Sequence, residues 1–153
     1  MDRRRFYLLS VALAAGQLIG QTKDPFIGTW LLDRSKSDFD PPSNFIRRTM
    51  IVEPVENGFH CIIKTLNDRQ QTVEVVYAAH YDNKDIPIEG SVLDTVAVRR
   101  IDPNTIERTG KIKGKTVETA TMKLSADRKV LTVTTKGSVD GQEYSSEQVF
   151  ERQ

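Results

Sequence analysis

The sequence predicts an all-β fold, an antiparallel up-and-down meander closed into a barrel of about eight to ten strands. Three observations support this. The 153-residue length suits one domain that buries its own core. Val, Thr and Ile recur along the chain after residue 24, where Ala and Leu are less frequent. Short runs of these residues alternate with turn residues about every 8 to 12 positions, a spacing typical of sandwiches and barrels.

The first 20 residues differ from the rest and are interpreted as a signal peptide. Three arginines at positions 3–5 precede an almost unbroken apolar run over 6–15. This run is shorter than the roughly 20 residues that a transmembrane helix needs, and no later segment comes closer. We therefore expect an exported protein, periplasmic or secreted, whose barrel domain is 21–153 and has no membrane span.

The export route and the cleavage site stay open. The segment 2–8, Asp-Arg-Arg-Arg-Phe-Tyr-Leu, resembles a twin-arginine signal, although Asp2 stands where that pattern prefers Ser or Thr. Ordinary secretory signals also begin with arginines. Small residues suitable for cleavage occur at both 12–14 and 14–16.

Charge and the rarer residues exclude several partners. The first 20 residues hold three Arg and one Asp, so removing them changes the net charge from +1 to about −1. No stretch concentrates Lys and Arg with aromatic residues in the way that phosphate tracking and base stacking require, so nucleic acid is not expected as a partner. The single cysteine, Cys61, is expected to be a small buried residue. His60 and His80 show no paired ligand spacing, so neither a metal nor another cofactor is predicted.

The strands follow one another as hairpins. We expect them near 26–33, 47–55, 59–66, 70–81, 93–101, 105–112, 116–124, 129–137 and 143–152. Gly, Asn, Asp and Pro separate nearly all of them, and these residues favour turns. The segment 34–45 is the exception: Pro41 and Pro42 exclude regular pairing, so we expect a loop that crosses one end of the sheet.

Two hairpin registers follow from the side-chain alternation. A two-residue Asn57-Gly58 turn places one apolar set on one face and a polar set, Glu53, His60 and Lys64, on the other. The apolar set is Met50, Val52, Phe59, Cys61 and Ile63. A two-residue Asp140-Gly141 turn gathers Leu131, Val133, Thr135, Tyr144, Gln148 and Phe150, with Arg152 at the end of that face.

The hairpin at 113–115 is predicted to have a three-residue loop. That loop aligns Ile106 and Ile112 with Ala120, Met122 and Leu124, and it also turns Arg108 and Glu118 inward. Two registers fit the hairpin around Pro103, so Arg99 and Arg100 are not assigned to a face. A meander leaves two unpaired edges, which closure into a barrel removes, although a sandwich would show the same alternation.

The first strand contains Gly28-Thr29-Trp30, which resembles the Gly-x-Trp that opens the first strand of lipocalins and other calycins. In that superfamily an Arg or Lys of the last strand packs over the tryptophan. The resemblance assigns this structural role to Arg152. A guanidinium over an indole face gains roughly 0.5 to 2 kcal/mol, and this contact would join the two ends of the domain.

More of the chain resembles a family of uncharacterised exported bacterial proteins described as having a lipocalin-like domain. The matching segments are 24–30, 36–37, 41–42, 81–87, 94–96, 100–102, 131–134 and 141–142. The resemblance implies the fold and no activity. The last strand lacks the Arg-x-Tyr that fatty-acid-binding proteins use to hold a carboxylate, and the Thr-Asp-Tyr motif and disulfides of kernel lipocalins are absent. The two prolines of 34–45 argue against a two-helix lid.

The candidate site is a set of inward polar residues. Arg108 and Glu118 would share the lumen with Tyr144 and Gln148 and could anchor the polar end of a ligand. Buried charges are costly unless paired, so the two charges could equally be a structural pair near a solvated mouth. Ile63, Val75, Tyr77, Val133 and Phe150 would line the apolar part, and each could also be ordinary core.

Two functions stay open from the sequence. In the first, the barrel encloses a small hydrophobic or amphipathic molecule. In the second, the lumen is filled and the outer surface serves as an interaction or structural module of the cell envelope. No nucleophile motif, phosphate loop or zinc signature is present, so no catalytic residue is assigned and an enzyme is not expected. A cavity inside the barrel would favour the first function.

Overall fold

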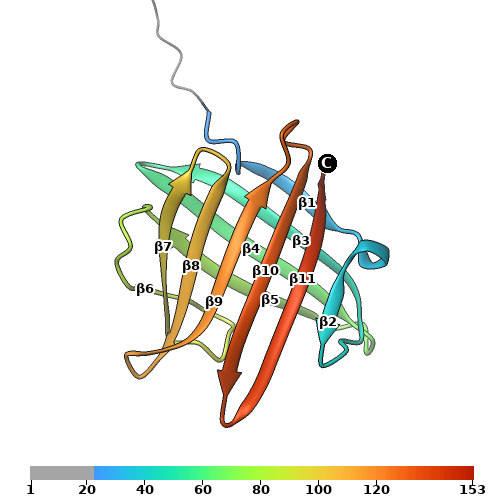
Figure 1. Cartoon of the computed structure of the whole chain (residues 1–153). Coiled ribbons are helices and arrows are strands. Elements are labelled where there is room, and N and C mark those ends of the chain that lie inside the picture. Colours follow the sequence, from blue (N-terminus) through green and yellow to red (C-terminus); the bar gives the residue numbers. More distant parts are fainter. Residues whose placement is uncertain (1–22) are drawn as a thin grey trace, which may run out of the picture.

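A computed structural model describes residues 23–153, which form one antiparallel sheet curled into a barrel (Figure 1). The predicted signal peptide lies outside the described residues. The strands are β1 (Gly28–Leu32), β2 (Asp38–Asp40), β3 (Phe45–Val55), β4 (Gly58–Asn67), β5 (Thr72–Ala79), β6 (Ile86–Pro87), β7 (Thr95–Asp102), β8 (Thr105–Ile112), β9 (Lys115–Leu124), β10 (Val130–Val139) and β11 (Gln142–Arg152). Among residues 23–153, no helix has the length and apolar character needed to cross a membrane.

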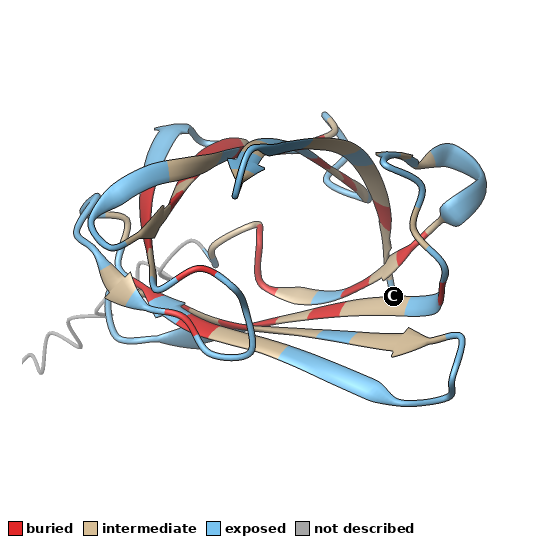
Figure 2. Ribbon diagram, turned by 90° about the horizontal axis from the view of Figure 1, so that it is seen from below, coloured by how far each residue is buried: buried red, intermediate tan, exposed pale blue. Residues whose placement is uncertain are grey.

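The strand order confirms the predicted barrel. Neighbours follow the order β5-β4-β3-β1-β11-β10-β9-β8-β7-β6. The two ends of this order meet at Val76 of β5 and Glu89, whose backbones exchange hydrogen bonds of 3.0 and 2.9 Å. Seen along its axis, the sheet forms a ring with buried residues on the inner side (Figure 2). Edge pairing therefore decides for the barrel and against the sandwich.

Each predicted strand is present, but the segment 34–45 is more regular than predicted. Residues Arg34–Lys36 form a 3₁₀ turn (η1), and β2 then pairs with β11 through Phe39 opposite Ser146. Pro41 and Pro42 follow this short strand rather than interrupting it, so pairing ends where the prolines begin. The short strand β6 was likewise not predicted.

The β10–β11 hairpin has the predicted register. Val139 lies opposite Gln142, which leaves Asp140 and Gly141 as a two-residue turn. Both turn residues have positive φ angles, 51° and 77°, as a type I′ turn requires. The register therefore follows directly from local turn chemistry.

The β8–β9 hairpin reaches the predicted register by another route. Its turn has two residues, Lys113 and Gly114, with φ angles of 49° and 76°, and the predicted three-residue loop is wrong. The pairing then shifts, leaving Val117 without a partner, and Arg108 lies opposite Ala120. A bulge supplies the extra residue that the longer loop would have supplied, so the faces remain as predicted.

The β3–β4 hairpin keeps its predicted faces, although its turn lies one residue earlier. Val55 pairs with Gly58, so Glu56 and Asn57 form the turn. This shifts the pairing by two residues, which leaves every side chain on its predicted face. Gly58 is needed here because a Cβ would lie 1.9 Å from the carbonyl oxygen of Ala79 on β5.

One end of the barrel is closed by the segment that precedes β1. Phe26 and Trp30 are buried, and the indole nitrogen of Trp30 donates to the carbonyl of Phe26 at 3.0 Å. Arg100 forms an ion pair with Asp24 at 3.2 Å, and Tyr81 donates its hydroxyl to the same carboxylate. The interior is therefore filled at this end, and the remaining space lies nearer the 140–141 turn.

Candidate ligand-binding site

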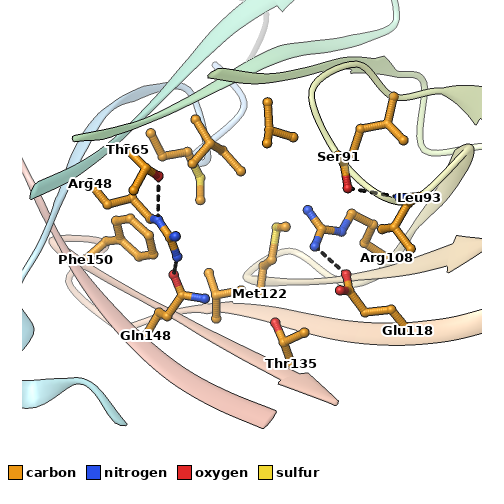
Figure 3. Close-up of a pocket in the computed structure, with 15 residues that line it drawn as sticks. Arg48, Thr65, Ser91, Leu93, Arg108, Glu118, Met122, Thr135, Gln148 and Phe150 are labelled. Atoms are coloured by element: carbon orange, nitrogen blue, oxygen red, sulfur yellow. Dashed lines mark hydrogen bonds and ion pairs between the residues drawn. The ribbon is translucent and has the colours of Figure 1, made fainter. Parts of the chain in front are cut away.

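The barrel contains a cavity of about 190 Å³ in the half away from Trp30. Inward side chains of the long strands form most of its wall, and the segment after β6 adds three more. The lining residues are Arg48, Met50, Ile63, Thr65, Val75, Ile88, Ser91, Leu93, Arg108, Glu118, Met122, Val133, Thr135, Gln148 and Phe150. The wall thus combines apolar side chains with polar and charged ones in nearly equal proportion (Figure 3).

Most of the residues selected from the sequence lie on this wall. They are Ile63, Val75, Arg108, Glu118, Val133, Gln148 and Phe150. Tyr77 does not line the cavity as expected: it lies one inward position deeper than Val75 and is only 2% exposed. Its ring packs edge-on against Phe59, with centroids 5.9 Å apart, so it belongs to the core.

Tyr144 also lies outside the wall, but it contacts the site. It is opposite Gly137, where a Cβ would come within 2.3 Å of the tyrosine Cζ. The missing side chain lets the ring lie over β10, and its hydroxyl donates to Oε2 of Glu118 at 2.8 Å. Tyr144 therefore orients a lining residue without lining the cavity itself.

Arg108 and Glu118 form a buried ion pair. Nη2 of Arg108 donates to Oε1 of Glu118 at 2.8 Å, and each side chain is 11% exposed. Burial alone would lower the pKa of Arg108, but Tyr77 and Glu118 raise it above its ordinary value. Both oxygens of the carboxylate accept a hydrogen bond, and the two charges cancel. The pair is therefore balanced in charge, although among residues 23–153 Nε of Arg108 is buried without a hydrogen-bond partner.

Arg48 is the principal residue that the sequence analysis missed. Its Nε donates to Oγ1 of Thr65 at 3.0 Å and its Nη1 to Oε1 of Gln148 at 2.7 Å. Its Cζ lies 4.4 Å from the ring centroid of Phe45. Within residues 23–153, no carboxylate pairs with Arg48, and its Nη2 has no hydrogen-bond partner. Burial lowers its pKa to about 10, so the side chain still carries its charge at neutral pH.

The alternation of inward and outward side chains along β3 indicates that Arg48 faces the barrel interior. Met50 and Val52 were placed inside, and Arg48 precedes Met50 by two positions on the same strand, so it shares their face. Thr65 follows Ile63 in the same way. Ser91 and Leu93 lie between strands, where no such period applies.

The charges give the cavity a net positive wall. Arg48 and Arg108 lie on opposite sides of it, with Met122 between them (Figure 3). These two positive groups face a single carboxylate, that of Glu118. In the described part of the chain, no group of three His, Cys, Asp or Glu is placed to hold a metal ion. The arrangement is suited to holding an apolar body and a negatively charged group.

No protein-family model and no curated protein matches the sequence. Among solved structures, the chain is similar to zebrafish ileal bile acid-binding protein in complex with cholic acid, with a TM-score of 0.54 and 11% identity. The similarity covers 84% of this chain and 99% of that one. At this identity it shows a shared fold, so the predicted antiparallel β-barrel is confirmed. The resemblance to the exported lipocalin-like family remains a prediction.

Proposed function

We propose that the protein binds a small amphipathic molecule inside its barrel and acts outside the cytoplasm, in the periplasm or as a secreted protein. The observation that carries the proposal is the cavity of about 190 Å³, whose wall combines apolar side chains with polar and charged ones. Binding sites for small molecules commonly combine these two features. The similar zebrafish structure is a complex with cholic acid, which supports binding of a small amphipathic molecule by a barrel of this fold.

The cavity volume limits the part of the ligand that can be enclosed. Pockets for drug-sized ligands measure about 300 to 1,000 Å³, whereas an engineered cavity of about 150 Å³ takes up benzene. A cavity of about 190 Å³ lies between these cases. The enclosed part is therefore the size of a small ring or a short chain with one polar group.

The cavity favours binding over a filled interaction module. In a filled barrel, Val75 and Val133 would meet side chains from the opposite wall, but here both border open space. The proposal that the protein is exported rests on the arginine-rich start and the apolar run of residues 1–20. A binding protein needs no catalytic residue, and none is assigned.

Native mass spectrometry of protein purified from its own host tests the binding. We expect a co-purified small molecule on the wild type and its loss in Val133→Phe, whose larger side chain fills part of the cavity. Thr134→Phe is the matched control, because the neighbouring residue on β10 is exposed and faces outward. No retained molecule, together with no thermal shift across alkanoates, alkanols and sterol acids, would count against the proposal.

Export has its own test. Cell fractionation and N-terminal sequencing of the mature chain are expected to find it outside the cytoplasm, beginning after one of the two small-residue sites within 12–16. An uncleaved cytoplasmic chain would contradict this part of the proposal and leave ligand binding untouched.

A further inference from the structure

We infer that the ligand carries a single negative charge, and that its acidic group, a carboxylate, binds at Arg48 rather than at Arg108. The inference rests on the proposed function, that a small molecule occupies the barrel, and adds the chemical class of that molecule. It also changes the anchor expected from the sequence, which was the pair of Arg108 and Glu118.

Arg108 is a poor anchor because its charge is already neutralised. Glu118 lies 2.8 Å away, and Tyr144 holds the other oxygen of that carboxylate in place. An anionic ligand at Arg108 would have to compete with a buried carboxylate and would be repelled by it. Separating such a pair is strongly unfavourable, since it leaves a buried charge unmatched.

In the described part of the chain, residues 23–153, Arg48 lacks such a partner. Its two hydrogen bonds go to the neutral side chains of Thr65 and Gln148, and its remaining contacts are with aromatic rings. Arg48 is partly buried. A cation withdrawn from water without a counter-ion is unfavourable, and the lowered pKa of this side chain reflects that cost. A bound carboxylate would supply the missing negative charge and accept from the unused Nη2, as guanidinium groups do in planar pairs with carboxylates.

A purely structural role for Arg48 does not require its charge. The pairing of β1 with β3 ends at Leu31 and Thr49. Beyond this point, the hydrogen bond from Arg48 to Gln148 links β3 to β11. A neutral amide side chain could make such a link without placing a cation in the wall. The excess charge therefore indicates recognition of an anion, and one excess charge suits a monoanion.

The test compares two probes of nearly equal shape, octanoate and octan-1-ol, by isothermal titration calorimetry at pH 7 on the mature wild-type protein. We expect octanoate to bind at least tenfold more tightly. Arg48→Gln should weaken octanoate binding by about 10- to 100-fold, the range for one charged hydrogen-bonding contact, and leave octan-1-ol binding unchanged. Arg48→Lys, which keeps the charge, should retain part of the preference.

Two controls separate binding from folding. Arg99→Gln removes an arginine that pairs with Glu107 on the outer surface at 2.8 Å, and it should leave both affinities unchanged. The melting temperature of Arg48→Gln shows whether the barrel stays folded, because the substitution removes two hydrogen bonds and the contact with Phe45 together with the charge.

Different results would contradict ligand binding and the assignment of an acid to Arg48. If neither probe binds the wild type, the proposed function is contradicted and the inference falls with it. If octan-1-ol binds as tightly as octanoate, or if Arg48→Gln keeps the preference for octanoate, only the assignment of an acid to Arg48 is overturned.

Discussion

Arg152, the last residue of β11, lies directly over Trp30 of β1, with its Cζ 4.1 Å from the ring centroid. Its guanidinium also donates to three backbone carbonyls, those of Pro25, Ile27 and Arg128, at 2.6, 2.8 and 2.9 Å. A Cβ at Gly28 would come within 2.6 Å of its Nη1, which explains the glycine two positions before the tryptophan. One side chain thus holds the start of the domain against its end.

Arg152→Met is expected to lower the free energy of unfolding by about 2 to 4 kcal/mol, because it removes the cation–π contact and three charge-assisted hydrogen bonds. Urea denaturation measures the change. Arg99→Met, at an exposed ion pair, should cost under about 1 kcal/mol. Equal losses in the two variants would show that Arg152 does not close the barrel.

Glu118→Gln is expected to destabilise the protein by about 3 to 5 kcal/mol, because it leaves the buried guanidinium of Arg108 without a counter-ion. Replacing both residues, as Arg108→Met with Glu118→Met, should cost less than the single change. A double-mutant cycle in urea measures the coupling. Additive single losses would mean that the two charges do not stabilise one another.

Cys61 gives the stability a pH dependence in the alkaline range. The side chain is 1% exposed, and burial raises its thiol pKa from 9.0 to about 11. The unfolded thiol therefore loses its proton first, so the contribution to stability is complete below pH 9 and declines between pH 9 and 11. The full decline in the free energy of unfolding is about 2 to 3 kcal/mol.

Urea denaturation between pH 8.5 and 10 checks this, with Cys61→Ala as the comparison. The variant is less stable throughout because it leaves a cavity, but its stability should fall less steeply with pH. A thiol reagent at pH 8 should modify the native wild type only as fast as the protein opens. The shielding of the thiol would be contradicted if wild type and Cys61→Ala lost stability equally with pH. Rapid modification of the native wild type by the reagent would contradict it as well.

Gly58→Ala is expected to destabilise the β3–β4 hairpin strongly, by about 2 to 4 kcal/mol, because the added Cβ would meet the backbone of β5 rather than a movable side chain. Asn57→Gly is the control at the adjacent turn position, where φ is 58° and glycine is readily accepted. Thermal unfolding of both variants distinguishes close packing from a general effect of turn substitutions. A Gly58→Ala protein as stable as Asn57→Gly would refute the close approach.

Local chemistry explains how much could be predicted. Asp140 and Gly141 adopt the two positive φ angles that their side chains favour, so the register of β10 and β11 follows from neighbouring residues. The alternation around Met50 and Ile63 likewise determines which faces turn inward. At Val117 the predicted loop was wrong, since a bulge and a shorter turn give the same downstream register as a longer turn.

The candidate site was only partly predictable for a related reason. Alternation places Arg108, Glu118 and, in retrospect, Arg48 inside the barrel, because side-chain direction depends only on position along a strand. Alternation does not show which of these charged side chains contact one another. Glu118 reaches Arg108 because their strands are neighbours and Gly137 leaves room for Tyr144, whereas among residues 23–153 no acidic side chain pairs with Arg48.

The sequence by itself determined nine of the strands and their inward faces, since these depend on local backbone preferences and a two-residue period. The contact that joins the two ends of the domain came from the resemblance to calycins. Only the tertiary structure decided which of the inward charges are matched. That outcome depends on contacts among side chains distant in the chain, between Arg108, Glu118 and Tyr144 on one side and around Arg48 on the other. Charge balance in a buried space is a property of the closed barrel.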